Sequence, residues 1–160
     1  IPIIIDADAL NDLNKDDYSF LSNRCIITPH IKEFSIMLNK SVDEVKYNSI
    51  AHASNFAVEN NIIVALKSAD TIIAYPNGKI IITDFGSPSL AKAGSGDCFA
   101  GIITGLVSQK YSLEDSVVIA CYILGKSSKI SENKYSQYSV IITDVINNFG
   151  DAINDIKEDS

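Results

Sequence analysis

The chain has 160 residues, of which 46% are hydrophobic and 21% are charged. This excludes a disordered chain and predicts one domain with a substantial core. Twenty acidic residues against thirteen basic ones give a formal net charge of −7. That charge excludes a general nucleic-acid binder, which needs a basic face to release counterions, although a few lysines and helix N-termini can still bind a small anion.

The cysteines and the apolar stretches indicate where the protein works. Cys25, Cys98 and Cys121 are an odd number, lie far apart and include no CxxC pair, which favours neither a disulfide framework nor a zinc site. The most apolar long stretch, residues 98–107, is too short to cross a bilayer. We therefore expect a protein of the reducing cytoplasm without a membrane partner.

Short apolar runs alternate with helical patterns along the first half of the chain. Continuous, mostly β-branched runs predict buried parallel strands at 3–5, 25–28 and 62–66. Pro76-Asn77-Gly78 lies between two further runs, 71–75 and 79–83, and predicts a β-hairpin there. The alternation predicts an α/β fold with a mostly parallel sheet and one hairpin.

Capping residues predict where the helices begin. Pro29 suits the first turn of a helix with Thr28 as its cap. Ser41 and Glu44 form a capping-box sequence, which predicts a second helix running to about residue 60. Three more helices are expected at 97–109, at 113–130 and, capped by Thr143 and Asp144, at 143–156. The segments 85–96 and 133–139 are expected to be loops.

The strongest candidate site is Ala93-Gly94-Ser95-Gly96-Asp97, where a polar loop leads into an apolar helix. Two glycines allow backbone N–H groups to approach an anion, and the helix N-terminus adds the positive end of its dipole. Asp97 is either an ordinary first-turn acid or a base that accepts a proton from a hydroxyl. The spacing matches neither a dinucleotide-binding fingerprint nor a P-loop.

Four motifs occur in one order: DADALN at 6–11, TPHIKE at 28–33, LKSADT at 66–71 and LAKAGSGD at 90–97. Together they resemble the ADP/ATP-dependent NAD(P)H-hydrate dehydratases, ribokinase-like proteins of the YjeF C-terminal type. The resemblance runs from about residue 3 to 149. It implies a ribokinase-like three-layer sandwich, of which the chain 1–160 would be the C-terminal portion of a single domain. The start of the chain, within an apparent strand and without an initiator methionine, also favours a piece of a longer polypeptide.

The resemblance implies phosphorylation of the C6 hydroxyl of hydrated NAD(P)H by ADP or ATP, with Mg²⁺, followed by loss of phosphate. Asp97 would be the catalytic base and would also contact the substrate. The backbone amides around Gly94 and Gly96 would hold the phosphoryl group. The implied nucleotide-binding residues are Lys67, Ser68, Ala69, Asp70, Thr71, Gly94, Ser95 and Gly96.

Three further sets of residues have competing interpretations. His30 is either a polar residue of a helix first turn or, as the resemblance favours, a contact to the hydrated dinucleotide. Lys67 is either a solvated residue at a strand end or a point charge for phosphate. Asp6, Asp8 and Asn11 follow a strand and either help to hold Mg²⁺ or only form a turn. No protein-bound metal site is therefore assigned from the sequence.

Some positions depart from the pattern of the family. Ser68 stands where glycine is usual. Residues 86–89 (GSPS) stand where the family has an asparagine and a second glycine. Residues 124–128 (LGKSS) stand where the family has a His-Gly…Ala-Gly pattern. Two alternatives stay open. One is a ribokinase-like kinase of a vitamin precursor or sugar, and the other, which rests on these departures and on the missing front half, is a degenerate subunit without catalysis. An exposed sheet edge is expected where earlier strands belong. A homo-oligomer or a partner chain supplying the N-terminal half is therefore expected.

Overall fold

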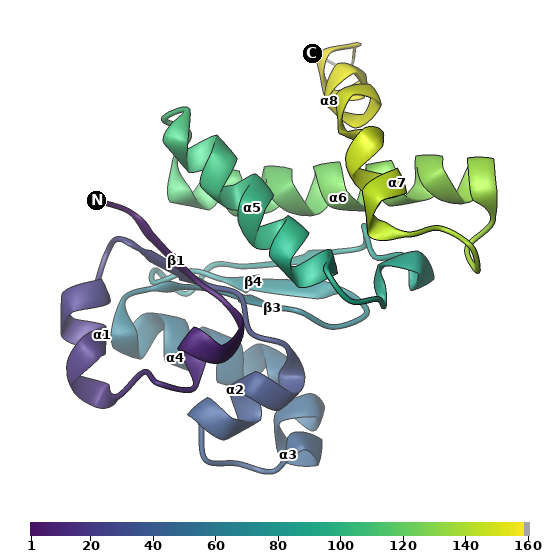
Figure 1. Cartoon of the computed structure of the whole chain (residues 1–160). Coiled ribbons are helices and arrows are strands. Elements are labelled where there is room, and N and C mark those ends of the chain that lie inside the picture. Colours follow the sequence, from purple (N-terminus) through teal and green to yellow (C-terminus); the bar gives the residue numbers. More distant parts are fainter. Residues whose placement is uncertain (159–160) are drawn as a thin grey trace.

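The computed structural model describes residues 1–158, and in these residues a five-stranded sheet lies between two layers of helices (Figure 1). The strands are β1 (Ile3–Ile5), β2 (Cys25–Ile27), β3 (Ile63–Leu66), β4 (Thr71–Ala74) and β5 (Ile80–Thr83). They follow one another across the sheet in the order of the chain. The predicted three-layer α/β sandwich is confirmed.

Strand direction changes in the middle of the sheet. β1, β2 and β3 pair in parallel, with Ile4 opposite Ile26 and Ile27 opposite Val64. β4 and β5 then add as an antiparallel hairpin on β3. The predicted Pro-Asn-Gly turn joins the two hairpin strands, and Gly78 takes the positive φ of 82° that favours glycine there. The sheet is therefore mixed, with its parallel pairs confined to β1–β3.

Both faces of the sheet are covered, which explains why the strands are continuously apolar rather than alternating. One core lies between the sheet and the helices from the first half of the chain, and it contains Ile27, Val64 and Leu66. The other core lies between the sheet and the helices from the second half, and it contains Ile26 and Ile63. Both cores are buried, so neither side of β2 and β3 has room for a polar side chain.

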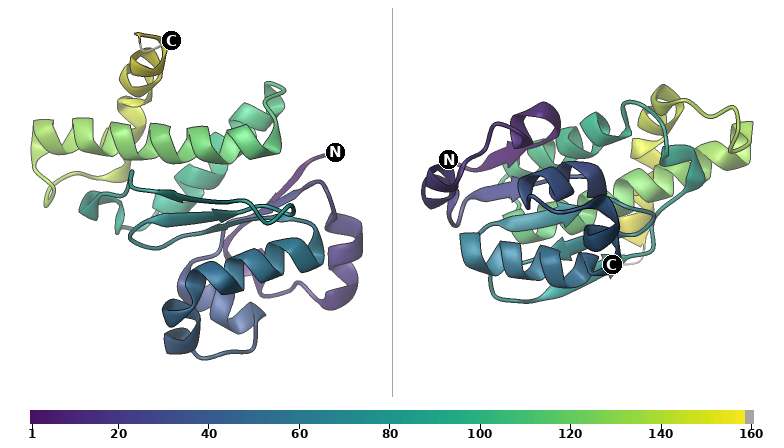
Figure 2. Two further views of the ribbon diagram at one scale, coloured as in Figure 1. Left: turned by 180° about the vertical axis from the view of Figure 1, so that it is seen from behind. Right: turned by 90° about the horizontal axis from the view of Figure 1, so that it is seen from below.

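The lower layer comes from the first half of the chain (Figure 2). It contains the 3₁₀ turn η1 (Ala7–Leu10) and the helices α1 (Lys15–Leu21), α2 (Ile31–Met37), α3 (Val42–Tyr47) and α4 (Ser49–Asn60). Aromatic rings fill its centre. The Phe56 ring lies 5.3 Å from the Tyr18 ring and 5.4 Å from the Phe34 ring, and both pairs have edge-to-face geometry, which stabilises aromatic pairs.

The upper layer comes from the second half. It contains the 3₁₀ turn η2 (Pro88–Leu90) and the helices α5 (Ser95–Ser108), α6 (Leu113–Tyr135), α7 (Ile142–Asn147) and α8 (Phe149–Glu158). Phe99 and Ile103 of α5 pack with Cys121 and Leu124 of α6 in the upper core. Between residues 1 and 158, no helix is both long and apolar enough to cross a membrane.

Several predicted helix boundaries were wrong. α2 begins at Ile31, and its cap is His30 rather than Thr28: the Glu33 N–H donates to Nδ1 of His30 at 2.9 Å, and the His30 N–H donates to the Glu33 carboxylate at 2.7 Å. Thr28 lies three residues before the first residue of α2, and its hydroxyl donates to Oδ1 of Asp6 at 2.7 Å, across the β1–β2 pair.

Three helices also differ in extent. The predicted helix 42–60 is divided at Asn48, and the last predicted helix is divided at Asn148. α6 runs to Tyr135, so the predicted loop 133–139 begins too early. The last cap is also different: Asp144 accepts the Ile141 N–H at 2.9 Å, and Thr143 lies inside α7. Ser41 does cap α3, accepting the Glu44 N–H at 3.2 Å.

A close contact joins α6 to the segment that follows β5. A Cβ atom placed on Gly125 would lie 2.1 Å from the carbonyl oxygen of Phe85 and 2.6 Å from its Cβ. Only glycine allows this approach. The helix therefore packs tightly at Gly125 despite the unusual residues on either side of it.

Replacing Gly125 with alanine is therefore expected to lower the free energy of unfolding by about 1–3 kcal/mol, through overpacking. Urea unfolding measures this change. Gly105→Ala in α5 is the matched control, because no atom lies within 4 Å of the added Cβ. That variant is expected to be neutral or more stable by up to about 1 kcal/mol, since alanine favours a helix. Equal effects in the two variants would contradict the close contact at Gly125.

Candidate functional site

Three successive parallel strands end beside the N-terminus of α5. Asp6 follows β1, His30 lies three residues after β2, and Lys67 follows β3. The Lys67 N–H donates to the Pro29 carbonyl at 2.8 Å, which extends the parallel pairing beyond the strands. Ligands of open α/β sheets bind at this carboxyl edge, and the structure brings the predicted residues of three motifs to it.

An ion pair forms the centre of this edge. The Nζ atom of Lys67 lies 2.6 Å from Oδ1 of Asp6, which also accepts the Thr28 hydroxyl. The side chains of Lys67 and Asp6 are only 23% and 12% exposed. Partial burial strengthens such a pair relative to one at the surface. Lys67 is therefore held in place rather than free in solvent.

The N-terminus of α5 lies next to this ion pair at Gly96. A Cβ atom at Gly96 would lie 3.2 Å from Nζ of Lys67 and 3.6 Å from Oδ2 of Asp6. The first N–H groups of a helix have no intrahelical acceptor and carry the positive end of the dipole. A lysine ammonium and a helix N-terminus thus converge on one point, an arrangement suited to an anion such as phosphate.

The backbone before the helix is fixed by Gly94, which is the helix cap. Gly94 has a φ of 89°, in the left-handed region, and a Cβ there would lie 3.3 Å from Ile142 of α7. The preceding Lys92 donates from Nζ to the carbonyl oxygen of Val140 and, at 3.4 Å, to that of Gln137. Loop 92–94 is therefore held against the segment that leads into α7.

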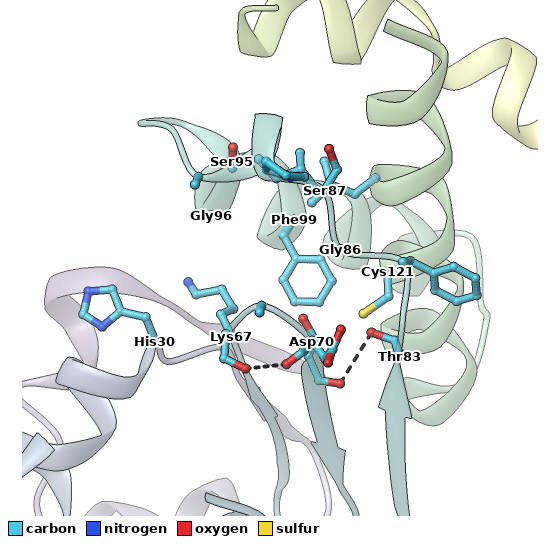
Figure 3. Close-up of a pocket in the computed structure, with 18 of the residues that line it drawn as sticks. His30, Lys67, Asp70, Thr83, Gly86, Ser87, Ser95, Gly96, Phe99 and Cys121 are labelled. Atoms are coloured by element: carbon cyan, nitrogen blue, oxygen red, sulfur yellow. Dashed lines mark hydrogen bonds between the residues drawn. The ribbon is translucent and has the colours of Figure 1, made fainter. Parts of the chain in front are cut away.

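A cavity of about 900 Å³ opens beside this point (Figure 3). Its volume lies in the usual range of small-molecule sites, about 300–1,000 Å³. The predicted residues that line it are His30, Lys67, Ser68, Ala69, Asp70, Thr71, Ser95 and Gly96. Figure 3 shows Lys67 and His30 on one side, with Phe99 pointing into the space between Lys67 and Cys121.

Other predicted residues lie outside the lining. Asp97 is exposed in the first turn of α5, and Gly94 is the cap before it. Asp8 and Asn11 are exposed in the η1 turn, where the Asn11 N–H donates to the Asp8 carbonyl at 3.0 Å. Across residues 1–158, no three His, Cys, Asp or Glu side chains are grouped closely enough to hold a metal. The hydrogen bond between Asn11 and Asp8 is part of the η1 turn.

His30 has a structural role in α2 and also faces the cavity. It caps α2 through Nδ1 and also lines the cavity, with 52% of its side chain exposed. Because Nδ1 accepts the Glu33 N–H, the neutral ring carries its proton on Nε2. The cap thus orients the ring and leaves a donor for a ligand.

The sequence did not indicate the apolar part of the cavity. Phe85 and Leu90 line it from the loop after β5, and Phe99, Cys121 and Leu124 line it from α5 and α6. Burial raises the pKa of the Cys121 thiol to about 12, so this cysteine behaves as a small apolar residue, as expected. These residues are ordinary core types, and only tertiary packing brings them to a cavity.

The fold and the cavity place this chain in the ribokinase-like class of α/β proteins. A ribokinase-like superfamily protein from Enterococcus faecalis has the same fold, with a TM-score of 0.79 at 22% identity over 92% of this chain and 50% of that chain. The family model described as NAD(P)H-hydrate dehydratase matches residues 1–149. The chain therefore belongs to the NAD(P)H-hydrate dehydratase family.

Individual relatives agree with this assignment. The ADP-dependent (S)-NAD(P)H-hydrate dehydratase of Bacillus subtilis is 29% identical over 140 residues, which cover 88% of this chain and 50% of that protein. A crystal structure of the Bacillus subtilis ADP/ATP-dependent enzyme with ATP/Mg²⁺ gives a TM-score of 0.85 at 26% identity and covers 96% of this chain and 54% of that one.

The bifunctional NAD(P)H-hydrate repair enzyme Nnr of Helicobacter pylori is 35% identical over 141 residues, 84% of this chain and 30% of that protein. The chain thus spans about half the length of the dehydratase relatives and about a third of the bifunctional ones.

Proposed function

We propose that this chain forms part of an enzyme that dehydrates hydrated NAD(P)H with ADP or ATP as the phosphoryl donor. The observation that carries the proposal is the convergence of Lys67, Gly96 and the α5 N-terminus beside a nucleotide-sized cavity. Family membership supplies the substrate class. In the proposed reaction the C6 hydroxyl of the hydrate attacks the terminal phosphoryl group, whose bond to the rest of the nucleotide breaks and releases AMP from ADP, or ADP from ATP. The ring nitrogen then donates electrons to expel phosphate from C6, and loss of a proton from the neighbouring C5 carbon restores the dihydronicotinamide.

The residues of the site have distinct roles in this proposal. Asp97 takes the proton of the attacking hydroxyl. The first amides of α5 stabilise the charge of the transferring phosphoryl group, which is the main requirement of such a transfer. Lys67 compensates phosphate charge, and residues 67–71 line the nucleotide side of the cavity. His30 contacts the dinucleotide through Nε2.

Mg²⁺ enters this proposal with the nucleotide. Asp6 is already paired with Lys67, and the described residues offer no cluster of acids for a protein cage. Mg²⁺ commonly binds through substrate phosphates with one or two carboxylates and several waters. When bound, it would neutralise phosphate charge, while Lys67 and the α5 amides act from the protein side.

We further propose that residues 1–160 are the C-terminal portion of one dehydratase domain that works in the cytoplasm. The outer edge of β1 pairs with no strand of the described residues, whereas its inner edge pairs with β2. The relatives are about twice as long. An N-terminal half, in the same polypeptide, in a partner chain or from a second copy, would continue the sheet at β1.

The deciding assay follows the near-ultraviolet absorbance of reduced nicotinamide after hydrated NADH is mixed with the protein, ADP or ATP, and Mg²⁺. Nucleotide-dependent recovery of this absorbance supports the proposal. Accumulation of a stable phosphorylated alcohol would indicate a ribokinase-like kinase instead. Absence of nucleotide binding in the complete parent protein would indicate a degenerate subunit. Activity only in the complete parent would show that this chain needs the other half.

A further inference from the structure

A buried polar cluster lies behind the cavity, between η2 and α6. The hydroxyl of Ser87 donates to Oε1 of Glu132, and the Ser89 N–H lies 3.4 Å from the same oxygen. The Ser87 and Ser89 hydroxyls are 3.0 Å apart, and Ser89 is 2.5 Å from the hydroxyl of Ser128. One carboxylate oxygen thus holds two residues of the η2 turn, which are 43 and 45 positions away in sequence.

The cluster is unusual because it buries hydroxyl groups beside a carboxylate. Ser89 and Ser128 are 2% and 0% exposed. Buried polar groups are costly unless they are hydrogen-bonded, and bonds to a charged acceptor are the strong ones. Partial burial raises the pKa of Glu132, but hydrogen bonds from Ser87 and Ser89 outweigh it and leave the pKa below the usual value. Glu132 therefore acts as an ionised acceptor.

The loop held by this cluster is one wall of the cavity. Gly86, Ser87, Pro88 and Leu90 line it directly. Figure 3 shows Ser87 across the cavity from Asp70. At its base, a Cβ on Gly86 would lie 2.1 Å from the carbonyl oxygen of Ala69. The wall therefore rests on the 67–71 loop at one end and is tied to α6 at the other.

We propose that Glu132 is a positioning residue of the nucleotide cavity, which acts through Ser87 and Ser89 to hold the 85–91 wall in the shape that admits a nucleotide. This inference rests on the proposed function. Ser87 and Ser89 are among the residues that depart from the family pattern. In this chain they are anchored by Glu132, so their presence does not indicate a degenerate site.

The test compares Glu132→Ala and Glu132→Gln with Glu114→Ala, an exposed glutamate in the first turn of the same helix. Calorimetry measures ADP affinity, and hydrogen exchange measures the amides of residues 89–91. Glu132→Ala is expected to weaken ADP binding by about tenfold or more and to speed exchange in 89–91, while exchange in β3 stays unchanged. Glu132→Gln, which keeps an acceptor, is expected to lie between this variant and the wild type. Glu114→Ala is expected to match the wild type.

A double-mutant cycle separates positioning from general destabilisation. One arm is the Ser87→Ala/Ser89→Ala variant, and the other is the same variant with Glu132→Ala added. If Glu132 acts through the serines, the added change lowers ADP affinity little further. Unchanged ADP affinity in Glu132→Ala, with or without faster exchange, would overturn the inference and leave the proposed function intact. Absence of ADP binding in the wild type, in this chain and in the complete parent, would overturn the proposed function and the inference with it.

Discussion

Replacement of Asp97 with alanine is expected to lower turnover by roughly 10²–10⁴-fold, the usual contribution of a general base. ADP affinity is expected to change only a few-fold. Asp97 is exposed in the first turn of α5 and does not line the cavity, so its replacement leaves the cavity lining unchanged. The expected loss falls on the proton transfer that the proposed function assigns to Asp97. Steady-state rates and calorimetry with ADP measure the two quantities.

Two comparisons make the Asp97 result specific. Asp43→Ala removes an exposed acid from the first turn of α3, remote from the cavity lining, and controls for the loss of a helix-dipole contact. Asp97→Asn keeps the shape of the side chain but removes the base, and it is expected to be as inactive as the alanine variant. A wild-type rate in either Asp97 variant would remove this residue from the mechanism.

Replacement of Gly96 with valine is expected to abolish detectable ADP binding. The added Cβ lies 3.2 Å from Nζ of Lys67, so the two methyl groups of valine must displace the Lys67–Asp6 pair or the helix N-terminus. They also occupy the space where phosphate would meet the α5 amides. Calorimetry with ADP is the direct measurement.

Gly101→Val is the matched control for Gly96→Val. Gly101 lies in the same helix, and no atom is found within 4 Å of a Cβ placed there. Both variants carry the same cost of a β-branched residue in a helix, so a difference between them reports on the site alone. ADP binding at wild-type strength in Gly96→Val would refute the phosphate cradle.

The strands could be predicted from the sequence because burial on both faces leaves a strong local signal. Ile26 and Ile27 face opposite cores, and β2 (Cys25–Ile27) has no polar member. The hairpin was equally clear, since the turn at Gly78 requires its particular backbone conformation. These elements depend on residues adjacent in the chain, and for that reason a local pattern sufficed.

The errors share a physical origin in contacts between distant residues. Thr28 has the side chain of a good cap, but α2 begins only at Ile31, and the Thr28 hydroxyl donates to Asp6, 22 positions earlier. His30 then caps the helix with a ring nitrogen. Glu132 could not be linked to the cavity from the sequence, because its serine partners become neighbours only when η2 packs on α6. The motifs thus predicted the polar side of the site, and packing had to supply the rest.

The strand order has a consequence for synthesis on the ribosome. Each new strand pairs with the strand made just before it, so the sheet can grow from β1 to β5 as the nascent chain emerges. The upper helices come last. At translation rates of about 5–20 residues per second, the upper face of the sheet, including Ile26, Ile63 and Ile73, stays exposed to water for several seconds. Chaperones that bind exposed apolar strands would meet the nascent chain at this stage, before α5 and α6 close over the sheet.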